Sequence, residues 1–206
     1  MKTKWLLLCT LGVSLNMIFS YAQNTEIMTH SLLKIANDDL EKWVSLIKKD
    51  NIQNYGFNSN DELNKIELGM PIQTLLLSPS FYEDSLLSDN NYFIESEEYR
   101  IPIIVNGTIR SFLILNNENN QWLVVGVGEN ILASNLMNCI QINQIEIENV
   151  IVFLHEPLSR SVYLITDFYN READASFFLL RRIAEKGMKK DEILTLIHQK
   201  IKAWEK

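Results

Sequence analysis

Residues 99–130, YRIPIIVNGTIRSFLILNNENNQWLVVGVGEN, contain three apolar runs separated by two polar turns. The first turn is Asn106-Gly107, a dipeptide that accepts the positive φ angles of a type I′ hairpin turn. The second turn spans Asn117 to Asn120. We therefore predict an antiparallel meander with strands over 99–105, 108–116 and 121–127. Pro102 falls in the first strand and cannot donate a ladder hydrogen bond, so we expect it to face an edge or a bulge.

The second and third strands of this meander are apolar on both sides. Phe112 and Ile114 alternate with Leu113 and Leu115, and residues 122–127 repeat the pattern. A sheet with one face in water would instead alternate apolar and polar residues. The pattern predicts that both faces are covered near the middle of the meander. Helices on both sides would do this, and so would helices on one side with a partner on the other.

Amphipathic helices are predicted at both ends of the chain. Residues 31–49 carry apolar side chains at three- and four-residue spacing, and the polar residues at 37–39 could divide this segment into two shorter helices. Another helix is expected over 129–140, directly after the meander. The C-terminal region predicts two helices, over 174–187 with Asp174 as its cap and over 190–204.

Shorter apolar runs account for the remaining strands. Pro71 to Leu77 predicts one strand, while 150–154 and 162–166 predict a hairpin. The sequence therefore predicts a single α+β domain. Its antiparallel sheet of about five to six strands would be built on the central meander and packed by the N-terminal and C-terminal amphipathic helices.

Residues 1–22 have the features of a secretory signal peptide. A short basic start precedes an apolar run from Trp5 to Phe19. Ser20 and Ala22 then place small residues at the two positions that a signal peptidase recognises. We expect cleavage after Ala22, which leaves residues 23–206 as the mature domain, secreted or periplasmic. The apolar run is shorter than the ~20 residues that span a bilayer. We therefore expect no stable membrane insertion after cleavage, and the alternative is that the segment stays uncleaved as a membrane anchor.

Composition and charge exclude several classes of partner. The chain has 206 residues, 47% of them hydrophobic, with 19 basic and 26 acidic side chains and a formal net charge of −7. Binding to nucleic acid or to an anionic membrane surface requires clustered positive charge, so neither is expected. Cleavage of the signal would remove Cys9 and leave Cys139 without a disulfide partner. Cys139 lies among apolar residues, which predicts a buried, inert thiol.

Two stretches match cofactor or metal motifs only in part. Gly126-Val127-Gly128 follows a strand and precedes a helix, but the third glycine of a dinucleotide turn would fall at Ile131. Glu129 would also place negative charge where a phosphate binds. We interpret these glycines as structural and expect no cofactor. The acidic run from Glu95 to Glu98 lacks the loop pattern of a calcium site, so we interpret it as a solvated face.

The loop after 150–154 holds the candidate catalytic residues. His155-Glu156 begins like a zinc-protease helix, but the second histidine would fall at Ser159, and Pro157 would break the helix. We therefore expect no metal site. Ser159, His155 and Asp167 have the side chains of a catalytic triad, although they lie on and beside one hairpin without a nucleophile elbow. The alternative interpretation is a solvent-exposed loop histidine.

Several turn and core motifs are similar to those of small exported single-domain proteins of unknown function from Bacteroidetes-type bacteria. These motifs are Tyr55-Gly56-Phe57, Leu68-Gly69-Met70-Pro71, Asn106-Gly107 and Trp122-Leu123-Val124-Val125. The resemblance covers most of the mature chain and implies an exported single domain. It implies no catalytic residues.

The sequence matches catalytic motifs only in part, and the strands of the meander are apolar on both sides. Together these observations favour a binding function. We expect an exported, non-enzymatic binding or accessory module that acts through a sheet face or groove, with a protein partner or as a homo-oligomer. Two alternatives remain. One is a hydrolase that uses the His155 loop, and the other is an inhibitor or partner of another exported enzyme.

Overall fold

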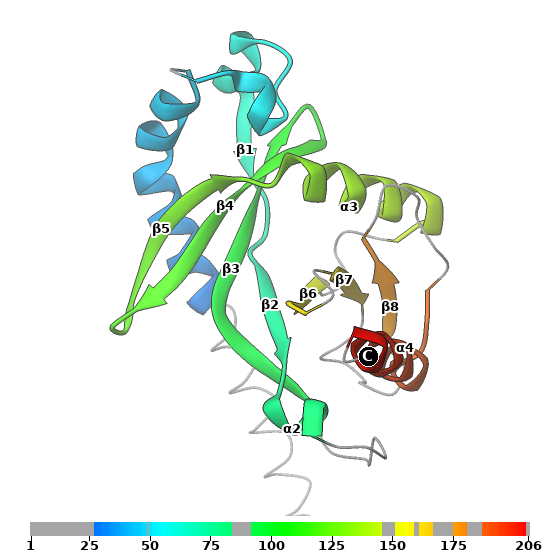
Figure 1. Ribbon diagram of the computed structural model, residues 1–206. Helices are drawn as coiled ribbons and strands as arrows, with labels where there is room; N and C mark the ends of the chain where they lie inside the picture. Colours follow the sequence, from blue (N-terminus) through cyan, green and yellow to red (C-terminus); the bar gives the residue numbers. More distant parts are fainter. Residues whose placement is uncertain are drawn as a thin grey trace, which may run out of the picture.

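A single mixed sheet runs through the molecule (Figure 1). The computed structural model describes residues 27–48, 50–83, 92–145, 151–158, 161–166, 175–180 and 187–204. Within these ranges the sheet has eight strands in the order β5-β4-β3-β2-β6-β7-β8, and β1 pairs with β3 beside this path. The expected α+β class is confirmed, but the sheet is larger than five to six strands.

The predicted meander is confirmed and forms one half of the sheet. Its strands are β3 (Phe93–Val105), β4 (Thr108–Glu118) and β5 (Gln121–Gly128). Asn106 and Gly107 have φ angles of 50° and 73°, as a type I′ turn requires. Asn119 and Asn120, with φ angles of 54° and 63°, form the second turn, which is tighter than the sequence suggested. These two-residue turns fix the register of β4 against both neighbours.

The second half of the sheet joins the meander through a parallel pair. β2 (Ile72–Leu77) pairs antiparallel with β3 and parallel with β6 (Ile151–Glu156). The expectation of an entirely antiparallel sheet is therefore wrong. β2 and β6 are separated in sequence by the whole meander and a helix, and such a long connection permits parallel pairing, which no local turn signal can indicate. The remaining strands are β1 (Ile66–Leu68), β7 (Ser161–Thr166) and β8 (Ser176–Leu179).

In the part of the chain that the structure describes, three long helices cover the sheet. The N-terminal helix spans residues 27–48 without a break, so the expected region is helical and the division into two shorter helices is wrong. The other two are α3 (Asn130–Asn143) and α4 (Lys190–Trp204), both close to their expected positions. The short elements are η1 (Ile52–Tyr55), η2 (Asn60–Lys65) and α2 (Pro79–Glu83).

The predicted helix over 174–187 is wrong where the structure describes it, because Ser176–Leu179 is strand β8. Phe177 and Phe178 are both buried, and they enter different hydrophobic clusters on opposite faces of the sheet. A strand directs adjacent side chains to opposite faces, whereas a helix here would direct them to neighbouring positions on its surface. The cap residue Asp174 and residues 181–186 lie outside the described residues.

Pro102 lies within β3, which has neighbours on both sides, although proline has no N–H group to donate to a neighbouring strand. Its carbonyl accepts a hydrogen bond from the Gly69 amide at 2.8 Å, in the interruption between β1 and β2. The N–H and C=O of one strand residue point to the same side, so the donor that proline lacks falls opposite this interruption. A shift of register between Ile103 and Ile104 lies beside it, which agrees with the expected bulge.

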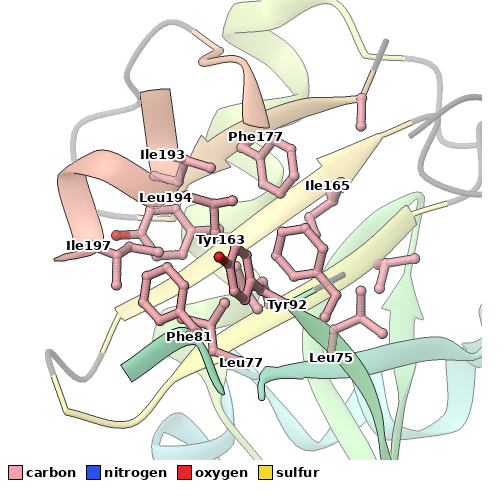
Figure 2. Close-up of a cluster of buried hydrophobic side chains, with 14 of the residues drawn as sticks. Leu75, Leu77, Phe81, Tyr92, Tyr163, Ile165, Phe177, Ile193, Leu194 and Ile197 are labelled. Carbon is pink, nitrogen blue, oxygen red and sulfur yellow. The ribbon is translucent and has the colours of Figure 1, made fainter. Parts of the chain in front are cut away.

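Within the described residues, three hydrophobic clusters make up the core. The first lies beneath α4, where Ile193, Leu194 and Ile197 face aromatic side chains from α2 and the sheet (Figure 2). The second lies between the N-terminal helix and the meander, and the third lies beneath α3 on the opposite face of the sheet. Phe112 and Leu113 of β4 are both fully buried, in different clusters. The expected covering of both faces is therefore confirmed for the middle of β4.

Candidate functional site

A buried arginine joins the meander, β2 and the start of α3. Arg100, on β3, is 6% exposed, and its Nε and Nη2 donate to the two carboxylate oxygens of Glu129 at 2.6 and 3.0 Å. Its Nη1 donates to the Thr74 hydroxyl at 2.6 Å and to the Glu98 carboxylate. The guanidinium also lies over the Phe153 ring, 5.9 Å from the ring centre. Four of the five N–H donors of the Arg100 guanidinium therefore have acceptors within the described chain, so this residue acts mainly as a structural cation.

The local backbone explains why Glu129 reaches Arg100. Glu129 stands between β5 and α3 in the left-handed conformation, with φ 62°, and its carbonyl accepts the first helical hydrogen bond from the Ala133 amide. Burial lowers the pKa of Arg100, but the hydrogen bonds and charges of Glu129 and Glu98 outweigh this effect and hold the pKa above its ordinary value. The carboxylate that sequence analysis placed in the first turn of a helix is therefore the partner of a buried cation. Its role is to hold the start of α3 against the sheet.

The structure places only part of the candidate triad. His155 is half-buried on β6, opposite Val162 of β7, while Ser159 and Asp167 lie outside the described residues. Among the described residues, the His155 imidazole has no hydrogen-bond partner. The structure thus places His155 on a strand of the sheet, at the end of the hairpin.

The neighbouring Glu156 has a defined role that the sequence did not indicate. It is fully buried and accepts hydrogen bonds from the Leu158 amide at 2.9 Å and from the Tyr82 hydroxyl at 3.4 Å. Burial and the Glu156 carboxylate raise the pKa of Tyr82 to about 12. Tyr82 and Glu156 are distant in sequence, so no local motif could have paired them.

The described residues contain no group of three or more His, Cys, Asp or Glu side chains that could hold a metal ion. In the acidic run, Glu98 binds Arg100, while Glu95 and Glu97 are exposed. Cys139 is buried on α3, and burial raises the pKa of its thiol. None of the described helices is long and apolar enough to cross a membrane.

The two ends of the sheet differ in how they are protected. At one end, Phe177 of β8 exchanges two backbone hydrogen bonds with Met188, at 2.9 and 2.8 Å, so another segment of the chain covers that edge. At the other end, no described strand pairs with the outer side of β5. We call this outer side, from Gln121 to Gly128, the β5 edge.

The β5 edge combines exposed apolar side chains with a complete lack of charge. Leu123 is 37% exposed and Val125 is 41% exposed, and no charged residue occurs between Gln121 and Gly128. The described chain therefore does not itself cover both faces at β5, and covering by a partner stays a prediction. Trp122 packs on Tyr99 beneath the N-terminal helix, with ring centres 5.3 Å apart, so one face of β5 is covered. Sequence analysis identified the apolar pattern but could not show which strand would be at the edge.

Comparison of the chain with models of known protein families, with curated proteins and with solved structures gave no match. The resemblance to exported proteins of unknown function therefore stays an expectation. The case for a functional surface depends on the geometry of the β5 edge.

Proposed function

We propose that the protein is an exported, non-enzymatic binding or accessory module that acts through the β5 edge. One observation carries the proposal: the strand at the end of the sheet is uncharged along its whole length and exposes Leu123 and Val125. Unpaired edge strands are ready templates for another strand, and proteins usually protect them with charge, proline or a covering segment. The other end of this sheet has such a covering segment in Met188.

The chemistry of the edge determines the kind of contact that it makes. The outward N–H and C=O groups of β5 supply main-chain hydrogen bonds to an added strand, as in known modes of peptide recognition by sheet edges. Leu123 and Val125 supply apolar contact beside that ladder. The Arg100 cluster supports this surface indirectly, because Glu129 fixes the chain where β5 passes into α3.

A lysine substitution on the edge tests the proposal. The mature protein is immobilised and exposed to native envelope and secreted material, and the retained proteins, including further copies of the chain, are quantified. Leu123→Lys places a charge on the edge and should reduce retention at least tenfold, which corresponds to about 1.4 kcal/mol.

Ile142→Lys is the matched control. Ile142 is 66% exposed on α3, so the substitution makes the same change of side chain on a different element. Retention that is equal in both variants would contradict binding through the β5 edge. The same conclusion would follow if the unsubstituted protein stayed a strict monomer and retained nothing.

A further inference from the structure

We infer that the occupant of the β5 edge is a second copy of the same chain, paired antiparallel about a two-fold axis that passes between Val124 and Val125. This inference rests on the proposed function, because it uses the same edge. Three independent observations support it: the order of faces along β5, the space beside Gly126, and the distribution of charge.

The register of β5 on β4 shows which residues share a face. Leu123 pairs with Asn116 and Gly126 pairs with Ile114, so both lie on the same face as the even-numbered residues of β4. Trp122 and Val127 pair with Asn117 and Leu113 on the opposite face.

A shift of register makes this order symmetric. The ladder shifts at the step from Val124 to Gly126, so Val125 is an extra residue in β5. Without the extra residue, Leu123 and Gly126 would lie on opposite faces. With the extra residue, positions at equal distance on either side of the point between Val124 and Val125 lie on the same face of the sheet. Leu123 matches Gly126 in this way, and Trp122 matches Val127.

Antiparallel pairing about that point places chemically matched residues opposite each other. Leu123 of one copy lies opposite Gly126 of the other, on the α3 face of the sheet. Trp122 lies opposite Val127 on the face covered by the N-terminal helix, which is an aromatic and β-branched pair of the kind that stabilises neighbouring strands. Every such contact occurs twice, as an isologous interface requires.

Gly126 supplies the second observation. Its backbone does not have positive φ, and an added Cβ would meet only Ile114, with the nearest atom at the ordinary distance of 3.7 Å. The described chain therefore accommodates a side chain at this position. A glycine inside a strand often marks the close approach of another group. In the dimer that group is Leu123 of the second copy.

The distribution of charge favours self-pairing at this edge. The chain has a net charge of −7, which generally opposes contact between two copies, but β5 itself is neutral. Pairing brings the Gln121 end of one β5, which lies beside Glu118 of β4, near the Gly128 end of the other. There Asn130 contributes a neutral side chain, and the Glu129 carboxylate is already bound by Arg100. Glu118 of one copy therefore does not face an unpaired carboxylate of the other copy at this contact.

The size of the contact determines its strength. β5 has eight residues, whereas a standard stable interface uses about 20–30 residues on each side. We therefore expect a weak, reversible dimer rather than an obligate one. Its population should rise with protein concentration through the micromolar range.

Sedimentation velocity of the mature protein over a series of concentrations measures this equilibrium. The unsubstituted protein and Ile142→Lys should show the same reversible dimer, and Leu123→Lys should weaken it at least tenfold. Circular dichroism melting curves verify that both variants are folded. A dimer that Leu123→Lys leaves unchanged would place the interface elsewhere and overturn the inference.

Cysteine cross-linking tests the position of the axis. Val125 of one copy lies one residue from direct opposition to Val125 of the other, within reach of a disulfide whose Cα atoms are usually about 4.4–6.8 Å apart. Val125→Cys should form a covalent dimer on mild oxidation, while Ile142→Cys should not. Buried Cys139 is present in both variants and serves as an internal control.

The outcomes separate this inference from the proposed function. A strictly monomeric protein without Val125→Cys cross-linking overturns self-pairing. If that monomer still retains a different protein, and Leu123→Lys abolishes the retention, the β5 edge binds an extended segment of another chain. In that case the proposed function stands. Loss of both self-pairing and retention overturns both.

Discussion

Arg100 is a single residue that connects three parts of the fold. The Arg100 side chain is only 7% exposed, and its guanidinium binds the carboxylates of Glu98 and Glu129, whose side chains are 29% and 31% exposed. Burial of an ion pair is costly, so the net stabilisation depends on the hydrogen bonds that Arg100 makes to Glu129, Thr74 and Glu98. Removal of the cation would leave the Glu129 carboxylate without the two hydrogen bonds of Arg100, and within the described chain the Glu98 carboxylate would keep only the contact from the Thr74 hydroxyl at 3.3 Å.

Arg100→Met should therefore destabilise the protein by about 3 kcal/mol. Breaking a buried pair typically costs about 3–5 kcal/mol, and the partial exposure of both carboxylates places this case at the lower end. Lys42→Met is the control, because Lys42 is 63% exposed and 3.9 Å from Asp39, an exposed contact worth at most about 1 kcal/mol. Denaturant unfolding at pH 7 measures both. Equal effects of the two substitutions would refute the structural role of Arg100.

Tyr82 predicts a loss of stability at high pH. The unfolded chain releases the phenolic proton near pH 10, whereas the folded chain holds it to about pH 12. Between these values unfolding releases a proton, so stability that is fully present below pH 10 decreases as the pH rises. Tyr82→Phe should remove this contribution. Unfolding of both proteins between about pH 9 and pH 11 tests it, and parallel pH profiles would contradict the Tyr82–Glu156 contact.

At the scale of elements, short turns decide how strands and helices are joined. Gly56 ends η1 with φ 84°, and an added Cβ would lie 2.4 Å from the Arg110 carbonyl oxygen on β4. Gly107, in the turn between β3 and β4, has φ 73° but nothing within 4 Å of an added Cβ. The two glycines therefore share a backbone conformation but differ in their surroundings.

This pair separates strain from steric overlap. Gly107→Ala should cost only the strain of a left-handed alanine, about 1–2 kcal/mol. Gly56→Ala adds the displacement of β4 backbone and should cost about 2–5 kcal/mol in total. Thermal unfolding followed by circular dichroism compares them. If Gly107→Ala proved the more damaging substitution, the close approach of η1 to β4 would be wrong.

The strands and helices that the sequence predicted well are those with strong local signals. Asn106-Gly107 determines its own turn, and the spacing of Ile193, Ile197 and Ile201 determines α4. Residues 176–179 had no such signal. Their side chains alternate between two buried faces of the sheet. This can be recognised only once β7 pairs with one side of β8 and Met188 with the other. A neighbouring strand and a bridging segment therefore replaced the expected helix.

At the scale of the whole molecule, the parallel pair of β2 and β6 joins the meander to the C-terminal half. Phe153 of β6 contacts Phe112 of β4, with ring centres 5.9 Å apart, and it also lies beneath Arg100. We therefore predict one cooperative unfolding transition for the mature protein. Tryptophan fluorescence, which includes Trp43 and Trp122 of the first half, should change together with far-ultraviolet circular dichroism. Two separated transitions would show that the halves fold independently.

The predicted export concerns the whole chain. The sequence predicts that signal peptidase removes residues 1–22, so the protein recovered from the secretory pathway should begin at Gln23. Intact-mass measurement and N-terminal sequencing determine this directly. A recovered protein that retains Met1 and the apolar run would contradict the predicted cleavage.

The candidate site could be predicted only in part. The apolar character of Trp122 to Val127 is plain in the sequence, but the order of strands is required to show that β5 lies at the end of the sheet. The extra residue at Val125, which makes the faces of β5 symmetric, depends on the pairing with β4. The contacts of Arg100 with Glu129 and of Tyr82 with Glu156 join segments that no local pattern relates.

The sequence by itself determined the meander, the major helices of the described chain and the overall α+β class, because turn chemistry and hydrophobic period act between neighbouring residues. Only the tertiary structure decided the parallel joining of β2 to β6, the strand at Ser176–Leu179 and the identity of the edge strand. These features depend on which distant segments become neighbours and which surfaces they leave uncovered. For the same reason, Leu123 and Val125 could be recognised as exposed only after the whole sheet was assembled.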